Sequence, residues 1–533
     1  MLADNLKTDR FRQDRQIQIL VGFILLLGFF SMFFNLGGRT IENQDNIRLA
    51  EVGREVLESG DWVMMHLAGG IYVDKPPLHF WNSALAYHVF GTNTFAARLP
   101  SALFAFLGLA AILFFCRAVD RENPRTAIYA SLFLISSYGY SYYARTARLE
   151  MEYSVLFSLS LMAFYLGYDR TGKKGKLTYY LLFWTFMGLA FLEKGPVALI
   201  PLLIAAAYLL LRRDWRRLRI GILAAAFPAF ILVVLPWVGF LYGHPQFESY
   251  RNLLEEARIM TRKEGLLYYF PSLMFNFFPG SAFLLVSTPR VRSWWNELKE
   301  RPWLVFSATW VIVYFTVLHL TSAKTARYLL PLFLPLSVIT AWITDRMVGL
   351  TVLAHNLRIY WKAAAAAFAI LVCLAPPVWT LFHGGQIHIA VIVSLTCMFS
   401  LFFAWRRSGD VVVFVCIVCI SGLLSVDVIR ATFNDQVSHN MRLYKLLKER
   451  DVQADQIFLY RTDREIRKYL GFYYDRLPAP EHQTVTNERG VKAVVFPVDQ
   501  LGNVQRVYGA GVKTVPLNGA GGGYDYAVLF TEP

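Results

Sequence analysis

Charged residues are scarce in this 533-residue chain, at 17% of the sequence, whereas a soluble globular domain carries about 25%. Hydrophobic residues make up 56% and stand in long runs. This composition argues against a soluble α/β enzyme, a disordered regulator or a compact nucleic-acid-binding domain. It indicates a membrane protein.

Cysteine is also rare, and all five cysteines lie inside apolar runs: Cys116, Cys373, Cys397, Cys416 and Cys419. A disulfide framework would need cysteines in segments exposed to an oxidising compartment. Cys416 and Cys419 lack the second half of a zinc site. We therefore interpret all five as small core residues.

The apolar runs are long enough to cross a bilayer, which takes roughly 20 mostly apolar residues, and they number about thirteen. The fifth and sixth are separated by three residues and could be one broken segment. The candidates lie near 17–35, 97–116, 126–142, 151–168, 178–192, 196–211, 220–242, 271–288, 303–320, 329–345, 363–382, 388–405 and 411–429. The sequence thus predicts a mostly α-helical, polytopic membrane protein.

The net charge of +15 follows from the distribution of Lys and Arg along the chain. If the N-terminus is inside, every inner connection carries basic residues, with a dense group at 212–219. The outer connections are poorer in Lys and Arg, as the positive-inside rule requires. The excess of basic over acidic residues therefore reflects topology and contact with membrane lipids, and no nucleic-acid partner is expected.

Three regions outside the bilayer are predicted to share the outer face: the loop 36–96, the loop 243–270, and the tail 430–533. The tail contains short alternating segments at 456–460 and 491–496 and a helical pattern at 439–450. We expect a transmembrane domain over 1–429, whose first outer loop carries the active site, followed by a small soluble α+β domain over 430–533.

Residues 44–56 in the first outer loop have apolar side chains at helical spacing, which predicts an amphipathic helix on the membrane surface. Asp45 would stand at its positive N-terminal end, either as a simple helix cap or as a functional carboxylate. Four charged residues of the same helix are expected to form a solvated face: Glu51, Arg54, Glu55 and Glu58.

The segment 72–81 reads Tyr-Val-Asp-Lys-Pro-Pro-Leu-His-Phe-Trp. Its two prolines restrict the backbone around the Asp74–Lys75 pair. An interfacial belt would account for the aromatic residues, but it would not explain a rigid acid–base pair. His66, His79 and His244 lack a recognisable metal-ligand spacing and are expected to be interfacial.

Isolated cations also stand at predicted outer helix ends, against the positive-inside bias. They are Arg145, Arg148, Lys194, Lys324 and Arg327. Five cations at three turns indicate an anionic ligand, most simply a phosphate at the membrane surface.

Together these segments resemble the GT-C membrane glycosyltransferases that use polyprenyl-phosphate sugars. The nearest resemblance is to the bacterial transferases that place 4-amino-4-deoxy-L-arabinose on lipid A, and the protein O-mannosyltransferases are more distant. The matching motifs are Asp-Asn-Ile-Arg-Leu-Ala-Glu at 45–51, Ser-Gly-Asp-Trp at 59–62, Tyr-Val-Asp-Lys-Pro-Pro-Leu at 72–78 and Phe-Ala-Ala-Arg-Leu-Pro-Ser at 95–101. The resemblance is close over residues 17–345. The last spans and the outer domain resemble the family only in their architecture.

The resemblance implies transfer of a sugar from a polyprenyl-phosphate donor to a lipid A-type lipid, another envelope glycan or a protein, with inversion. It implies a bacterial inner-membrane protein with a periplasmic active site and no required cofactor; a divalent metal is not indicated. Asp45 and Asp74 match the catalytic acidic positions. The donor phosphate would be held by Lys75, Arg258 and Tyr328, with Arg48, Tyr72, Lys194 and Arg327 nearby.

Two departures from the family pattern stand in this loop. The usual Asp-Glu pair is Asp45-Asn46 here, and the usual Glu before Lys-Pro-Pro is Asp74. The core phosphate chemistry can survive both changes, but the acceptor pocket need not match that of the family, so the sugar and the acceptor stay open.

A transporter or flippase of lipid-linked sugars is the alternative. That class places functional charges within its spans and has two related halves with interrupted helices. Here the candidate charges gather at one face, and the sequence has no evident internal repeat, which favours the transferase.

The topology gives a first prediction. Cysteines introduced at Ser59 and Asn503 should react with a membrane-impermeant reagent applied from the periplasmic side, because both positions lie in predicted outer regions. A cysteine at Arg212 should react only after the inner membrane is opened. Reversed reactivity at any of the three would overturn the predicted arrangement of spans.

Overall fold

The computed structural model describes residues 2–41, 44–257, 265–291, 294–321, 324–350, 387–408, 411–437, 439–462, 464–478, 491–508, 514–517 and 526–531, with isolated residues at 370, 374–378, 380–381 and 482. The chain divides into two compact units. The helical unit contains Met1–Asn35, Ser101–Gly243 and Glu255–Val428. The mixed unit contains Leu36–Pro100, His244–Leu254 and Ile429–Pro533.

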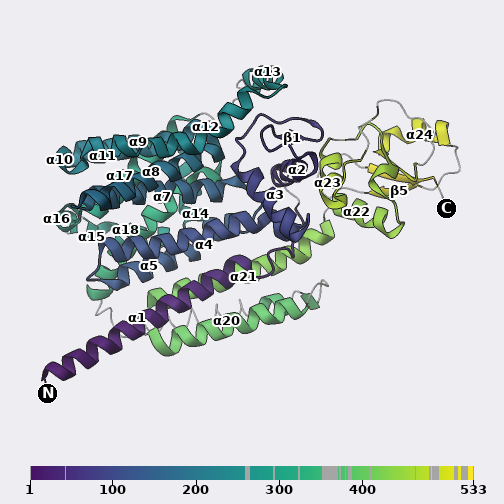
Figure 1. Ribbon diagram of the computed structural model, residues 1–533. Coiled ribbons are helices and arrows are strands. Elements are labelled where there is room, and N and C mark those ends of the chain that lie inside the picture. The colour runs from purple at the N-terminus through teal and green to yellow at the C-terminus, as the bar shows by residue number, and fades with distance from the viewer. Residues whose placement is uncertain are drawn as a thin grey trace. The chain divides into compact units, whose positions relative to one another are not determined.

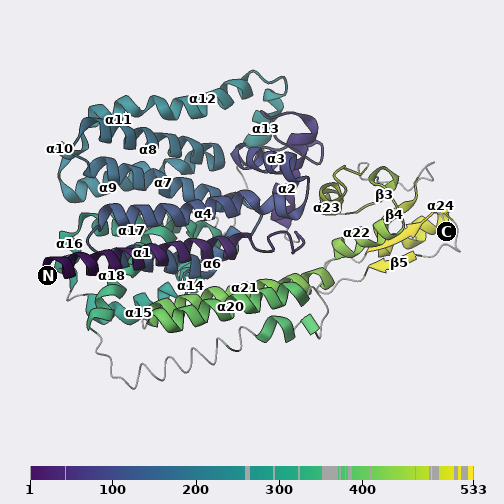
Figure 2. The same cartoon turned by 60° about the horizontal axis from the view of Figure 1, so that its bottom comes forward.

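Long helices build the helical unit, and the axes of α4, α7, α8 and α9 lie nearly parallel to one another in both views (Figures 1 and 2). Its α-helices are α1 (Leu2–Phe33), most of α4 (Thr94–Val119), α5 (Pro124–Ser136), α6 (Tyr138–Ala144), α7 (Leu149–Asp169), α8 (Lys173–Lys194), α9 (Ile200–Arg212), α10 (Trp215–Leu218), α11 (Ile220–Ala226), α12 (Pro228–Tyr242), α14 (Tyr269–Asn276), α15 (Gly280–Val291), α16 (Trp295–Glu300), α17 (Pro302–Leu320), α18 (Phe333–Leu350), α20 (Ile387–Ser408) and most of α21 (Val411–Val437). The 3₁₀ segments η1 (Gly195–Leu199) and η4 (Ala326–Leu332) precede α9 and α18.

Among the described residues, six helical stretches are long and apolar enough to cross a membrane, or seven if a pair bent by 110° counts as one span. The six are Thr94–Val119, Leu149–Asp169, Lys173–Arg212, Ile220–Tyr242, Pro302–Leu320 and Ala326–Met347, and the bent pair is Tyr269–Asn276 with Gly280–Ser287. The predicted spans 178–192 and 196–211 form a single run, Lys173–Arg212. Most of the predicted span 363–382 lies outside the described residues. The count of thirteen stays a prediction.

The outer surface of these stretches suits a lipid environment. In Ile220–Tyr242 only 11% of the most apolar window is buried, and Leu232 and Leu235 are 75% and 58% exposed. Exposure of such a contiguous apolar surface to water costs free energy, whereas contact with the hydrocarbon chains of lipids does not. The mostly helical membrane protein predicted from the composition is therefore confirmed.

The mixed unit combines segments that are far apart in the sequence. It contains α2 (Gln44–Ser59), β1 (His66–Leu67), β2 (Gly70–Ile71), α3 (Leu78–Phe90), most of α13 (Phe247–Ala257), α22 (His439–Glu449), β3 (Ile457–Leu459), α23 (Arg464–Tyr474), β4 (Ala493–Pro497), α24 (Leu501–Tyr508), β5 (Thr514–Leu517) and β6 (Tyr526–Phe530). This compact unit is thus larger than the predicted domain 430–533.

The four longer strands form a sheet in the order β3-β4-β6-β5. The β3–β4 pair is parallel, and the other two pairs are antiparallel. Alternate strand residues point to opposite faces, so Leu459 packs with Leu470 of α23 on one face, while Phe458 packs with Val504 of α24 on the other. Both predicted strands and the helix predicted at 439–450 are present.

Helix α2 is packed between α3 and α23, and glycines allow the close approach. A Cβ on Gly53 would lie 2.7 Å from Ser83 Cβ of α3, and one on Gly471 of α23 would lie 2.7 Å from Glu51 Oε1. The ring of Tyr87 in α3 also meets that of Phe472 edge-on. Segments from the first loop and the C-terminal region therefore form one core.

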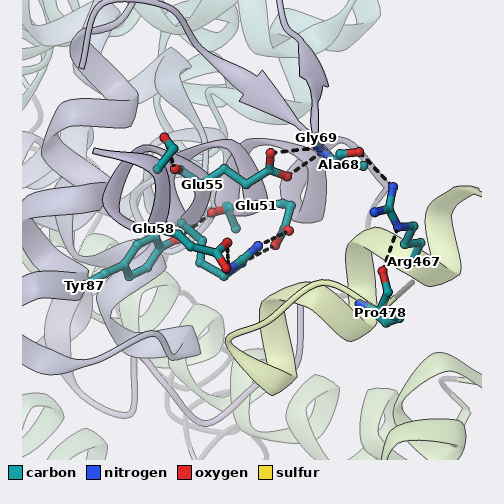
Figure 3. A network of polar contacts seen from close by, with 11 residues as sticks. Glu51, Glu55, Glu58, Ala68, Gly69, Tyr87, Arg467 and Pro478 are labelled. Atoms are coloured by element: carbon teal, nitrogen blue, oxygen red, sulfur yellow. Dashed lines mark hydrogen bonds and ion pairs between the residues drawn. The ribbon is translucent and has the colours of Figure 1, made fainter. Parts of the chain in front are cut away.

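The prediction that the four charged residues of α2 form a solvated face is wrong for three of them. Glu51 and Arg54 are 0% and 1% exposed, and Glu55 is also buried; only Glu58 is half-exposed. The reason is that α23 covers this face. Arg54 compensates the buried charge, because its guanidinium donates to both oxygens of Glu51 at 2.8 and 3.0 Å and to Glu58 at 2.7 Å (Figure 3).

Burial perturbs both partners of this pair. It raises the pKa of Glu51 from 4.5 to about 7, against the opposing effect of the Arg54 guanidinium. For Arg54, burial alone would lower the pKa, but the hydrogen bonds and charges of Glu51 and Glu58 outweigh this and raise it above its ordinary value, so the guanidinium stays charged. The folded state therefore favours protonated Glu51 more strongly than the unfolded chain does.

A second prediction concerns the stability of the fold against pH. Because folding raises the pKa of Glu51, its stabilising contribution is complete below pH 4.5 and is lost as the pH rises to about 7; it amounts to about 3 kcal/mol at most. Glu51→Gln should therefore reduce the fall in melting temperature of the purified protein between pH 4.5 and 7.5. Glu248→Gln, at an exposed carboxylate, serves as the control. Identical pH profiles for Glu51→Gln and wild type would contradict the assignment.

Candidate active site

Asp45 lies in the first turn of α2, as the helical pattern predicted. Ile47, Leu49 and Ala50 are buried and anchor this end of the helix. The amide dipoles at the start of a helix stabilise a carboxylate there. Arg48, three residues later, donates to Asp45 Oδ1 at 3.1 Å. Asp45 therefore belongs to an ion pair within the first turns of its own helix.

Asp74 and Lys75 follow the short β1–β2 hairpin. The Tyr72 amide donates to the Met65 carbonyl at 2.8 Å and closes the hairpin on that side. The hydroxyl of Tyr72 lies 3.4 Å from Asp74 Oδ2, and Lys75 Nζ lies 3.2 Å from Asp74 Oδ1. Burial, reinforced by the charge of Asp74, raises the pKa of Tyr72, so its phenol remains a hydrogen-bond donor.

Arg48 joins these two segments, because its guanidinium also lies 3.9 Å from Asp74 Oδ2. We call Asp45, Arg48, Asp74 and Lys75 the charged quartet. Two carboxylates face two cations, so the quartet has no net charge. Its side chains are between 29% and 48% exposed, which leaves all four within reach of a ligand. Four of the predicted site residues, with Tyr72 beside them, are therefore brought together.

Three further predicted residues lie together in the helical unit, around the buried carboxylate of Glu150. Arg148 and Arg327 approach the Glu150 oxygens at 3.0 and 2.9 Å. Lys194 Nζ lies 4.3 Å from the ring centre of Tyr328, a cation–π contact. We call Arg148, Glu150, Lys194, Arg327 and Tyr328 the Glu150 cluster.

Arg145 does not join this cluster, contrary to the expectation that the five isolated cations serve one anion. It pairs with Asp427 at 2.7 Å and donates to the carbonyls of Ser31 and Phe34 at 2.8 Å. Carbonyls at the C-terminal end of a helix lack intrahelical partners and attract a cation. Arg145 therefore secures the end of α1. Lys324 is buried, and Arg258 lies outside the described residues.

Sequence reasoning missed a histidine pair around Asp61. His244 Nε2 from the second loop and His66 Nδ1 lie 3.2 and 4.0 Å from Asp61 Oδ2. The other carboxylate oxygen accepts the amides of Val63 and Met64. The Ser-Gly-Asp-Trp motif was the available signal, but the sequence separation of about 180 residues concealed the contact with His244.

The comparisons with known proteins agree with the resemblance found in the sequence. A family model described as dolichyl-phosphate-mannose-protein mannosyltransferase matches residues 74–238. The undecaprenyl phosphate-α-4-amino-4-deoxy-L-arabinose arabinosyl transferase of Pseudomonas aeruginosa is 30% identical over 334 residues, which are 59% of this chain and 58% of that protein. The Edwardsiella ictaluri protein of the same name is 27% identical over 346 residues, 62% and 60% of the two chains.

The similarity in fold extends over more of the chain than the similarity in sequence. The crystal structure of ArnT from Cupriavidus metallidurans bound to undecaprenyl phosphate matches 97% of this chain and 98% of its own, with a TM-score of 0.73 at 19% identity. The sequence matches span about three fifths of the curated relatives. The chain has the polytopic fold of ArnT along nearly its whole length, and in sequence it resembles the aminoarabinose transferases.

Proposed function

We propose that this chain is a glycosyltransferase of a bacterial inner membrane that moves a sugar from a polyprenyl-phosphate donor to an envelope acceptor. The observation that carries the proposal is the charged quartet. It places two carboxylates and two cations on the same loop motifs by which the chain resembles polyprenyl-phosphate transferases. The predicted topology puts this loop on the periplasmic side.

The relatives support the choice of donor. Their names specify an undecaprenyl phosphate-linked aminoarabinose, and the ArnT structure contains undecaprenyl phosphate. We therefore propose an undecaprenyl phosphate-linked sugar as the donor and a lipid A-type lipid as the first acceptor to test. Asn46 and Asp74, where the chain departs from the family pattern, lie in or beside the quartet, so other glycans or proteins are the next acceptors to test.

The quartet suggests how the donor phosphate would be held. A phosphate that enters a neutral cluster adds negative charge, so an existing ion pair must open or another cation must approach. Lys75 can leave Asp74 and turn to the phosphate, because it is a flexible point charge. Arg258 of the second outer loop is the further cation we propose. Both would stabilise the leaving phosphate as the bond to the anomeric carbon breaks.

Asp45 would act on the acceptor. Its carboxylate can accept a proton from an acceptor hydroxyl as the new bond to the anomeric carbon forms. Attack from the face opposite the phosphate predicts inversion. With a phosphate as acceptor little deprotonation is needed, and Asp45 would act mainly by positioning.

The remaining predicted residues extend the donor site in this proposal. The Tyr72 phenol can donate a hydrogen bond beside Asp74. The resemblance also assigns Lys194, Arg327 and Tyr328, which belong to the Glu150 cluster of the helical unit, to binding of the donor. Their charge is already shared with Glu150, so we expect smaller losses on removing Lys194 or Arg327 than on removing Lys75.

The overall reaction is tested with the purified protein in detergent, where no bilayer separates donor from acceptor. Transfer of sugar from a synthetic polyprenyl-phosphate donor to lipid A, detected by mass spectrometry, supports the proposal. A flippase would bind the donor without transferring the sugar. Movement of intact donor across liposomes without any transfer would favour that alternative.

A third prediction concerns the proposed catalytic carboxylate. Asp45→Asn is nearly isosteric and should lower the transfer rate by at least about a hundred-fold, because the amide cannot accept a proton from the acceptor. Expression and melting temperature should stay unchanged. Asp455→Asn makes the same chemical change at an exposed site and serves as the control. Full activity in Asp45→Asn would reduce Asp45 to a partner of Arg48.

A fourth prediction concerns the phosphate. A hydrogen bond to a charged group contributes about 1.5–3 kcal/mol, so Lys75→Ala and Arg258→Ala should each lower kcat/KM by about ten- to a hundred-fold. In the double variant, the loss of transition-state stabilisation should be smaller than the sum of the two single losses, because both side chains bind one anion. Lys75→Arg should rescue poorly, since a planar fork replaces a point charge beside two prolines.

The decisive measurement for this site is the binding of undecaprenyl phosphate alone, without sugar or acceptor. Lys75→Ala and Arg258→Ala should bind it more weakly than wild type. Lys299→Ala, at a predicted cytoplasmic cation, is the control and should bind normally. If the first two variants bind as tightly as wild type, the phosphate site lies elsewhere.

A further inference from the structure

The turn between β1 and β2 has an unusual backbone. Its two central residues, Ala68 and Gly69, have φ angles of +53° and +79°. A two-residue hairpin turn of this kind needs positive φ at both positions. Glycine adopts that conformation freely, whereas in alanine the Cβ opposes it. The turn therefore depends on external contacts to hold Ala68 in place.

Glu55 supplies one such contact from the middle of α2. One carboxylate oxygen accepts the amide N–H of Ala68, and the other accepts that of Gly69 at 3.0 Å. The Glu55 side chain is buried. A carboxylate that accepts successive amides strengthens both hydrogen bonds through its charge. Glu55 thus holds the donor side of the turn.

Arg467 of α23 holds the acceptor side. Its Nη1 donates to the carbonyl of Ala68 at 2.8 Å, and its Nε donates to the carbonyl of Pro478 at 3.1 Å. Figure 3 shows Glu55 and Arg467 converging on the same turn. The guanidinium fork therefore ties the hairpin to the backbone that follows α23.

The same helix also holds the segment that leads into α2. The hydroxyl of Tyr473 accepts the amide N–H of Ile41 at 3.0 Å. Ile41 stands four residues before Asp45, and Ala68 stands six residues before Asp74. Helix α23 thus contacts both backbone segments that lead to the two carboxylates of the quartet.

We propose that Glu55 and Arg467 are positioning residues for sugar transfer: Glu55 ties the β1–β2 turn to α2 and Arg467 ties it to α23, and together they fix the spacing between Asp45 and the Asp74–Lys75 pair. This inference rests on the proposed transferase function. It assigns the C-terminal segment a role in the reaction although none of its residues belongs to the quartet. Small displacements of reacting groups cost large factors in rate, so the effect should fall on turnover.

The variants that test this are Arg467→Ala, Arg467→Lys, Glu55→Gln and Ala68→Gly. Arg467→Ala should lower kcat by about ten- to a hundred-fold and change the KM for the donor by less than about three-fold. Arg467→Lys should recover part of the activity, because an ammonium can reach the Ala68 carbonyl without the second contact. Arg476→Ala, an exposed arginine just beyond α23, is the control and should behave as wild type.

Ala68→Gly provides the sharper test, because it removes the steric opposition to positive φ. Introduced into Glu55→Gln, it should raise the activity at least three-fold above that of Glu55→Gln alone. A residue with a general structural role would not be rescued by a change confined to the turn. Failure of this rescue would overturn the positioning role of Glu55.

Amide hydrogen exchange of the peptide 66–75 measures the turn without any reaction. In Arg467→Ala and Glu55→Gln this peptide should exchange at least about ten-fold faster than in wild type. Unchanged exchange, or activity that falls only in proportion to melting temperature and yield, would overturn the proposal. If wild type shows no transfer at all, the proposed function fails, whereas the exchange experiment still decides whether α23 holds the hairpin.

Discussion

The pairing of Arg54 with Glu51 and Glu58 is the interaction on which the rest of the mixed unit depends. Removing a charge from water costs several kcal/mol unless a partner at hydrogen-bond distance compensates it. Each of these ions would destabilise the fold by about this much if its partner were absent. Arg54 makes three such contacts. It allows a helix with charges on several sides to be covered by α23. Without it, α2 would have only one face fit for packing.

Charge has two different roles along α2. Near the middle, Glu51, Arg54 and Glu55 are buried and paired, so they hold neighbouring segments in a defined register. At the start, Asp45 and Arg48 are partly exposed, and their pairing is weak enough to be exchanged for a ligand. A buried support beside an exposed reactive group is the arrangement that a precise site requires. The geometry of the quartet therefore depends on contacts made by side chains outside it.

Local patterns were sufficient to predict much of this protein. The apolar runs predicted a helical membrane protein, and the spacing of Ile47 and Ala50 predicted the helix that carries Asp45. Arg48 stands one turn after Asp45, so their pairing follows from helical geometry alone. The prolines after Lys75 likewise indicated a stiff segment. The strands at 457–459 and 493–497 were visible from their alternation.

Only the tertiary structure decided which charges are buried. Periodicity identifies one apolar face of a helix, and it assigns every charged residue of α2 to water. It has no information about α23, which stands more than 400 residues later in the chain and covers a second face of α2. Arg145 was misjudged for the same reason, because its partner Asp427 stands 282 residues later in the chain. The sequence determined the helices and the residues with reactive groups, whereas long-range packing determined which of those groups support the fold and which stay open to a ligand.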